Sequence, residues 1–138
     1  MIIADTGFWL ALANRTDRHH EAALQAMASL REGLVTTWPV LTETCHLLSS
    51  RLGVPAQLAF VRGVRNGACT VFQIGDGHLP RIAELMEHYA DPPMDLADAS
   101  LVVLAEELGS GRILSTDQRD FHTYRWKNRR PFRNLLLA

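Results

Sequence analysis

Four short stretches with strand-like composition alternate with longer segments of helical patterning. They are Met1–Ala4, Leu34–Thr37, Thr70–Ile74 and Arg112–Thr116. A short apolar run bounded by turn residues is typical of a strand that is buried on both faces. Strands that alternate with helices pair in parallel through right-handed crossovers. The pattern therefore predicts an α/β fold with three layers (α/β/α) and a central parallel sheet of four to five strands.

The helical segments carry recognisable start and stop signals. Pro39 suits the first turn of a helix, and Gly53 and Gly109 fall just past predicted helix ends. We expect helices over Phe8–Ala13, Arg18–Leu30, Pro39–Leu52, Ala56–Val64, Leu79–Tyr89 and Asp95–Leu108. A chain of 138 residues that is 47% hydrophobic can fill one core, so residues 1–138 are predicted to form a single domain. Trp9 and Trp38 are predicted to lie in that core.

Acidic residues fall where the predicted strands end. Asp5 directly follows the first strand, and Asp117 follows the last. Glu43 lies in the early turns of the helix after the second strand, and Asp95 and Asp98 open the helix that leads into the last strand. Ligands of open α/β sheets bind outside the carboxyl ends of the strands. Four separate segments are therefore predicted to bring carboxylates to one rim of the sheet.

Each of these acids also has an ordinary structural interpretation. Asp5 and Asp95 suit helix N-caps, Asp98 complements a helix dipole, Asp117 suits a turn, and Glu43 suits a half-exposed helix face. Their joint placement is harder to explain, because two unit charges about 4 Å apart repel by ~4 kcal/mol at an effective dielectric of about 20. That repulsion is large against a domain stability of about 5–15 kcal/mol. Either some of the acids are protonated, or a hard divalent cation such as Mg²⁺ or Mn²⁺ neutralises them.

Four motifs resemble the PIN-domain ribonucleases, a family that includes the VapC-type toxins of toxin–antitoxin pairs. They are MIIADTGFW, VLTETCHLL, MDLADASLVVLAEELG and ILSTDQRDF, and the resemblance runs from Met1 to about Phe132. The four core acids of the family, which are its catalytic and metal-binding residues, match Asp5, Glu43, Asp98 and Asp117. Positions that support the site match Thr6, Asp95 and Thr116.

The resemblance implies a Mg²⁺- or Mn²⁺-dependent endoribonuclease that hydrolyses RNA phosphodiester bonds. It further implies a toxin restrained by a cognate antitoxin protein, and a homodimer. One or two bound cations would lower the pKa of a water from about 15.7 towards about 7 and would stabilise the negative charge of the transition state. Two alternatives stay open: a catalytically inactive RNA- or partner-binding module of the same fold, and a metal phosphoesterase that acts on small phosphates.

Cationic side chains gather near the end of the chain. They are Arg125, Lys127, Arg129, Arg130 and Arg133, and the aromatic residues Tyr124, Trp126 and Phe132 lie among them. Such a segment can hold a phosphate backbone and stack unpaired bases, although a solvated edge explains it equally well. Because the formal net charge is only -1, RNA binding must come from a local patch of this kind.

The sequence also bears on the compartment. No apolar run approaches ~18 residues, so we expect no membrane span. The N-terminus has no basic region before Asp5, which speaks against a secretion signal. Cys45 and Cys69 match no zinc spacing and suit reduced thiols. We therefore expect a cytoplasmic protein.

Overall fold

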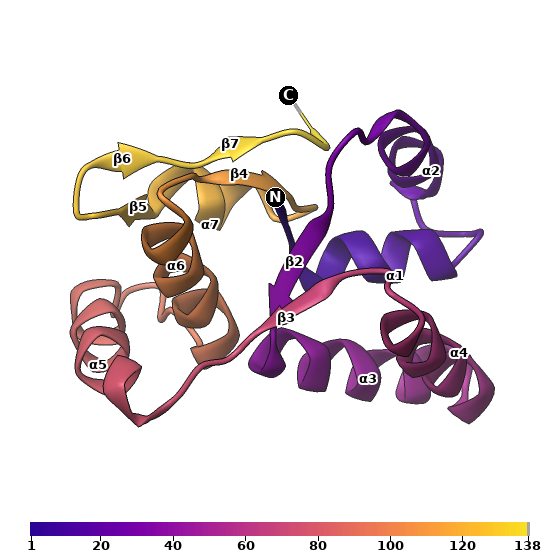
Figure 1. Ribbon diagram of the computed structural model, residues 1–138, viewed down its shortest axis with the longest axis horizontal. Coiled ribbons are helices and arrows are strands. Elements are labelled where there is room, and N and C mark those ends of the chain that lie inside the picture. The colour runs from indigo at the N-terminus through magenta and orange to yellow at the C-terminus, as the bar shows by residue number, and fades with distance from the viewer. Residues whose placement is uncertain (138) are drawn as a thin grey trace.

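A computed structural model describes residues 1–137, and its centre is a five-stranded sheet in the order β3-β2-β1-β4-β7 (Figure 1). Every pair of neighbouring strands in this sheet is parallel. The strands are β1 (Ile2–Ala4), β2 (Leu34–Thr37), β3 (Thr70–Phe72), β4 (Arg112–Leu114) and β7 (Arg133–Asn134). The predicted α/β fold with a central parallel sheet is thus confirmed.

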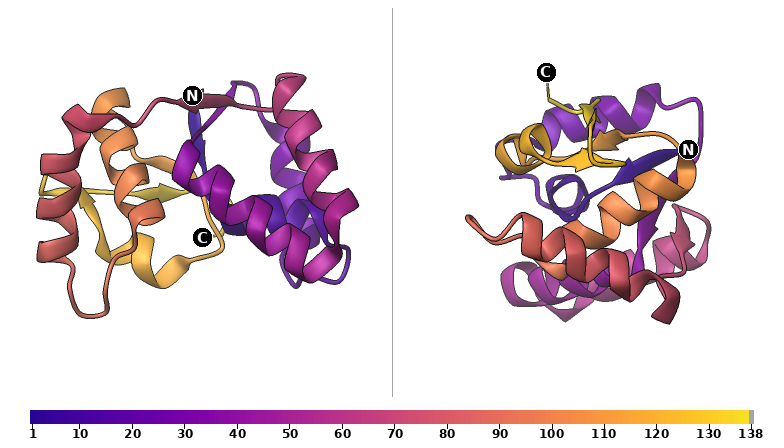
Figure 2. Two further views of the ribbon diagram at one scale, coloured as in Figure 1. Left: turned by 90° about the horizontal axis from the view of Figure 1, so that it is seen from below. Right: turned by 90° about the vertical axis from the view of Figure 1, so that its left-hand side faces the viewer.

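Helices cover the sheet on both sides. The helices are α1 (Thr6–Ala13), α2 (His20–Ser29), α3 (Trp38–Leu52), α4 (Val54–Arg65), η1 (Asp76–His78), α5 (Leu79–His88), α6 (Leu96–Leu108) and α7 (Gln118–Thr123). Figure 2 shows α5 and α6 on one side of the strands and the helices α1 to α4 on the other. None of the described helices is both long and apolar enough to cross a bilayer.

The core follows from the central position of β1. Ile3 pairs with Val35 on one side and with Ile113 on the other, and all three side chains are buried. Full burial of one such aliphatic side chain stabilises a fold by about 1.5–3 kcal/mol. The register sets the ends of β1 and β4 side by side, because Ala4 pairs with Leu114. Asp5 and Ser115 therefore leave the sheet next to each other.

Helix α6 is buried over most of its length and is anchored to the end of β2. The side chains of Thr37 and Ser100 share a buried hydrogen bond of 2.6 Å. Ser100 also donates to the carbonyl oxygen of Ala97 at 2.6 Å. These contacts place the first turn of α6, which carries Asp98, at the carboxyl edge of the sheet.

The segment after α7, for which no strand was predicted, contains three. It forms a hairpin of β5 (Arg125–Trp126) and β6 (Arg130–Pro131) and then the edge strand β7. Trp126 is buried, and its indole packs where a Cβ on Gly111 would lie. The aromatic residues of this segment thus belong largely to the core.

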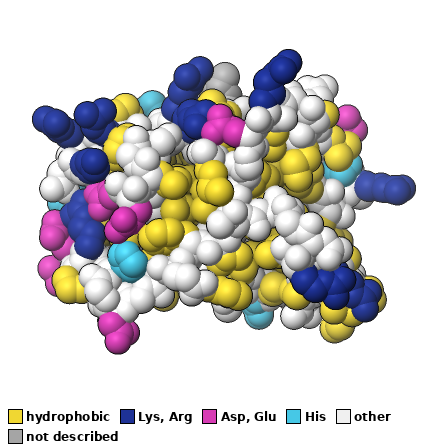
Figure 3. Space-filling view, viewed as in Figure 1, with side chains coloured by type: hydrophobic (Ala, Val, Ile, Leu, Met, Phe, Trp, Pro, Cys, Tyr) yellow, Lys and Arg dark blue, Asp and Glu magenta, His cyan; other side chains and the backbone are white. Residues whose placement is uncertain are grey.

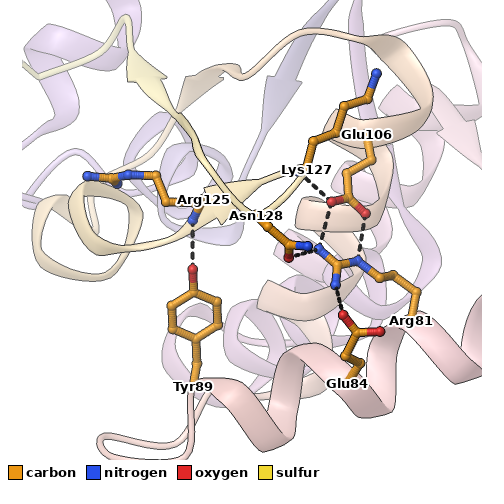
Figure 4. A network of polar contacts seen from close by, with 7 residues as sticks. All are labelled: Arg81, Glu84, Tyr89, Glu106, Arg125, Lys127 and Asn128. Carbon is orange, nitrogen blue, oxygen red and sulfur yellow. Dashed lines mark hydrogen bonds and ion pairs between the residues drawn. The ribbon is translucent and has the colours of Figure 1, made fainter.

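The tip of the hairpin is held by a network around Arg81 of α5 (Figure 4). Arg81 donates to both carboxylate oxygens of Glu106, at 3.0 and 2.9 Å, and also pairs with Glu84. The backbone N–H of Lys127 donates to Glu106 at 2.6 Å, and Arg81 donates to Asn128 at 2.9 Å. These contacts tie the hairpin to α5 and to the C-terminal end of α6.

The prediction that Trp38 belongs to the core is wrong. Its side chain is 50% exposed, whereas Trp9 is 4% exposed. Trp38 is the first residue of α3, and it lies directly beyond the end of β2. A residue at this position lies past the sheet that would cover it, so its apolar type gave a misleading signal.

Candidate metal and active site

Six acidic side chains line one hollow of about 290 Å³ at the carboxyl edge of the sheet. They come from the end of β1, from α3, from the start of α6 and from the start of α7. The acids are Asp5, Glu43, Asp95, Asp98, Asp117 and Asp120. Thr6 and Thr116 line the same hollow. The structure therefore brings together the four predicted core acids and the three predicted supporting residues.

Asp5 lies at the bottom of the site, with only 6% of its surface exposed. One carboxylate oxygen accepts from the backbone N–H of Thr6 at 2.7 Å, and the other accepts from the hydroxyl of Ser115 at 2.9 Å. The Ser115 hydroxyl in turn accepts from the backbone N–H of Asp117 at 2.9 Å. Ser115 therefore connects two of the acids, a role that sequence reasoning missed.

Glu43 is held by a pair of threonines. The hydroxyl of Thr6 donates to Oε1 of Glu43 at 2.6 Å, and the hydroxyl of Thr44 donates to that of Thr6 at 3.3 Å. Thr44 is fully buried and Thr6 nearly so. The orientation of the Glu43 carboxylate is therefore set by α1 as well as by its own helix.

Asp98 receives a hydrogen bond from a tyrosine that the sequence analysis placed with the cationic residues near the end of the chain. The Tyr124 hydroxyl donates to Oδ2 of Asp98 at 3.0 Å. The Tyr124 ring is buried and lies edge-on to Tyr89 and Phe121, with ring centroids 5.0 and 5.3 Å apart. This packing fixes the donor, which approaches from 26 residues away along the chain.

Asp95 and Asp117 also serve as helix caps. Asp95 Oδ1 accepts from the backbone N–H of Asp98 at 2.8 Å, and Asp117 Oδ1 accepts from that of Asp120 at 3.0 Å. The helix cap predicted for Asp95 is therefore correct, whereas Asp117, which was predicted to suit a turn, caps α7 instead. Asp117 also shares a side-chain hydrogen bond with Asp120.

Three of the acids are close enough to share one cation. Asp98, Asp117 and Asp120 each offer a carboxylate oxygen, and these oxygens lie within 4.8 Å of one another. Oxygen ligands lie about 2.0–2.6 Å from Mg²⁺ or Ca²⁺, so two ligands of one ion are at most about 5 Å apart. The donor set therefore fits a hard divalent cation. Asp120 was quoted in the fourth motif but was not among the predicted ligands.

Three of the acids resist ionisation when no cation lies among them. Burial raises the pKa of Asp5 to about 6, against the hydrogen bonds from Ser115 and Thr6. Burial, followed by the negative charges of Asp5 and Asp95, raises the pKa of Asp98 to about 8. Burial and the neighbouring Asp117 also raise the pKa of Asp120. A divalent cation would reverse these shifts by stabilising the charged forms.

Gly7 allows the first turn of α1 to approach the end of β4. A Cβ atom on Gly7 would overlap the side-chain oxygen of Thr116. The glycine in the first motif is thus required by close packing beside the acids rather than by a turn.

The predicted RNA-binding cations lie outside the acidic hollow. The Arg125 guanidinium donates to the carbonyl oxygens of His122, Thr123 and Tyr124 at the end of α7. Lys127, Arg129 and Arg130 belong to the hairpin, where Figure 3 shows Lys and Arg side chains gathered at the upper left. The hairpin tip contacts Glu106, eight residues along α6 from Asp98.

The suggestion that aromatic residues of this segment stack bases is wrong for Tyr124 and Trp126. Their side chains are buried, with 4% and 7% of their surface exposed. Arg130 and Lys127 instead lie over the Trp126 ring, 5.4 and 5.8 Å from its centroid. The Trp126 ring therefore stabilises the hairpin, and Tyr124 supports the site through its hydrogen bond to Asp98.

A parallel sheet with an acidic, all-oxygen site at its carboxyl edge is the class of α/β domain that the motifs predicted. The PIN domain family matches residues 2–127, and the chain belongs to this family. Ribonuclease VapC26 of Mycobacterium tuberculosis is 32% identical over 124 residues, which cover 90% of this chain and 92% of the relative.

Similarity to a second mycobacterial protein appears in both sequence and structure. The 23S rRNA-specific endonuclease VapC20 of Mycobacterium tuberculosis is 42% identical over 59 residues, covering 43% of this chain and 45% of the relative. A crystal structure of VapC20, described as a Sarcin-Ricin loop cleaving toxin, superposes with a TM-score of 0.79. The match has 25% sequence identity and covers 86% of this chain and 92% of that one. The predicted resemblance is thus confirmed.

Proposed function

We propose that this protein is a Mg²⁺- or Mn²⁺-dependent endoribonuclease that hydrolyses RNA phosphodiester bonds as the toxin of a toxin–antitoxin pair. The observation that carries the proposal is the meeting of acids from four segments in one hollow. Two relatives that are named as a ribonuclease and an rRNA endonuclease support the choice of RNA as substrate.

The residues of the site have separate roles in this proposal. Asp98, Asp117 and Asp120, with Asp5 below them, would hold the cation. When bound, the cation supplies a lowered pKa for a coordinated water and stabilises the negative charge of the transition state. Ser115 and Tyr124 keep their carboxylates in place through hydroxyl donors. Glu43, which Thr6 orients, would position the attacking water.

The partners follow from the same relationship. We expect an RNA substrate, a cognate antitoxin protein, a homodimer and a cytoplasmic location. Arg125, Lys127, Arg129 and Arg130 remain candidates for contacts with the phosphates of a long RNA, because several of these side chains reach solvent on the hairpin.

The proposal is tested by RNA cleavage in Mg²⁺ or Mn²⁺, with and without a chelator. We expect cleavage by the native protein and loss of cleavage for Asp5→Asn, while Asp76→Asn, an exposed aspartate outside the hollow, keeps full activity. RNA binding without cleavage by the native protein would instead establish the inactive binding module. Hydrolysis of nitrophenyl phosphate in preference to single-stranded or structured RNA would favour the small-phosphate phosphoesterase.

A further inference from the structure

A second hollow, of about 670 Å³, adjoins the acidic site. One wall is a stripe of α3 formed by Trp38, Thr42 and His46, which are four residues apart and so share a helix face. The opposite wall includes Leu96 at the start of α6 and Ile74 after β3. Glu43 and Asp95 line both this hollow and the acidic one, so the two are continuous.

Trp38 brings an exposed indole to the lining of this hollow. Half of its surface is exposed, and the facing Leu96 is 47% exposed. The Thr42 hydroxyl donates to the Trp38 carbonyl oxygen at 3.0 Å, which ties the first turn of α3 together. Exposed aromatic surface next to a reaction site is typical of a binding site, because burying it against a ligand is favourable.

The charges around the hollow restrict the ligand. Among its lining residues in the described chain, Glu43 and Asp95 are acidic and none is Lys or Arg. A phosphate would be repelled from such a wall, whereas a flat uncharged ring would not. Unpaired RNA bases bind proteins by stacking on aromatic side chains, and every base offers such a face.

We propose that Trp38 stacks an unpaired nucleobase of the RNA substrate, one that neighbours the phosphodiester held at the acids. The proposal rests on the proposed ribonuclease function and assigns its base-binding subsite to the hollow between α3 and α6. The shared residues Glu43 and Asp95 connect this subsite to the reaction site. Recognition by stacking makes single-stranded or looped RNA the substrate class.

Steady-state cleavage of an unstructured oligoribonucleotide tests the proposal. Trp38→Ala is expected to raise KM by roughly 10- to 100-fold, the range for loss of one base–aromatic stack, and to change kcat by less than about threefold. Trp38→Phe should restore most of the affinity, since it keeps a ring. The matched control is Val54→Ala, which truncates a 66%-exposed apolar side chain on α4 outside the hollow.

Tryptophan fluorescence supplies a readout that does not depend on cleavage. Trp38 is half-exposed, whereas Trp9 and Trp126 are buried, so quenching by the oligoribonucleotide in chelator should come from Trp38. We expect quenching in the native protein and in Val54→Ala and its loss in Trp38→Phe. If the native protein fails to cleave RNA but is still quenched, the ribonuclease function fails while the base-binding site stands.

Two results would overturn the base-binding site. One is an unchanged KM and unchanged quenching when Trp38 is replaced. The other is a native dimer that Trp38→Ala converts to a monomer in sedimentation while KM stays unchanged. That result would make this face a protein interface. Leu96→Ala, on the opposite wall, repeats the test if Trp38→Ala does not fold, and it should raise KM in the same direction.

Discussion

Two groups of carboxylates in this protein have opposite surroundings. Glu106 and Glu84 pair with Arg81, which donates to both oxygens of Glu106 (Figure 4). The acids of the active-site hollow form no ion pair with Lys or Arg within the described part of the chain. Their donors are instead neutral: the hydroxyls of Ser115, Thr6 and Tyr124, together with backbone N–H groups.

The two kinds of surroundings suit two different roles, one structural and one in ligand binding. A carboxylate that a guanidinium neutralises stabilises the contact between its elements and has little left to offer a ligand. A carboxylate that only neutral donors hold has no positive charge beside it to stabilise its ionised form. The raised pKa values of Asp5 and Asp98 are consistent with this lack of a counter-charge. In our proposal, the protein orients the acids of the hollow and an outside cation neutralises them.

The largest expected effect is on activity. Asp117→Asn removes one negative ligand, and we expect RNA cleavage to fall by about 100-fold or more, as for loss of one group that stabilises transition-state charge. Glu106→Gln, the corresponding change at the Arg81 network, should leave the cleavage rate within about twofold. Equal losses in the two variants, measured at one metal concentration, would contradict the separation.

Stability should respond in the reverse sense. Glu106→Gln weakens the bonds from Arg81 and from the Lys127 backbone, and we expect the free energy of unfolding to fall by about 1–3 kcal/mol. Asp98→Asn relieves repulsion and should leave the metal-free protein as stable or more stable. Denaturant unfolding in chelator measures both variants, and a greater loss for Asp98→Asn would overturn the comparison.

Ser115→Ala tests the neutral donors. The change removes the hydroxyl that bonds Asp5 and the backbone of Asp117, and we expect cleavage to fall by roughly tenfold, equivalent to about 1.4 kcal/mol. Ser29→Ala, an exposed serine on α2, is the control and should have full activity. Unchanged cleavage by Ser115→Ala would show that the hydroxyl does not position the acids.

The smallest expected effect is on the pH dependence of thermal unfolding. The folded pKa values of Asp5 and Asp98 are raised above the ordinary value of 3.8, to about 6 and about 8. Their contribution to stability is therefore complete below about pH 4 and is lost as the pH rises from there to the folded pKa values, about 6 for Asp5 and about 8 for Asp98. In chelator, Tm should fall by several degrees or more over this window, and Mg²⁺ should restore it. A Tm that rises over the same window in chelator would have the wrong sign.

The sequence was sufficient for the parts that depend on local pattern. Apolar runs and capping residues located the strands and helices to within a few residues, although β3 and β4 each end two residues before the predicted boundary. The positions of Asp5 and Asp117 followed because both stand after strands of one parallel sheet.

The parts that depend on register and on long connections were not accessible from the sequence. Ser115 reaches Asp5 only because Ala4 pairs with Leu114, and Tyr124 reaches Asp98 only because the chain returns after α7. The edge strand β7 carries Arg133 and Asn134, which show no apolar pattern. Trp38 resembles a core residue by type, but its place beyond the end of β2 leaves it exposed.

Diffraction from crystals soaked in Mn²⁺, recorded for its anomalous signal, tests most directly whether the acids form a metal centre. The account predicts a strong peak within the hollow, with oxygens of Asp98 and Asp117 as ligands and Asp5 beneath them. A hollow with no peak, at a Mn²⁺ concentration that saturates RNA cleavage, would contradict it.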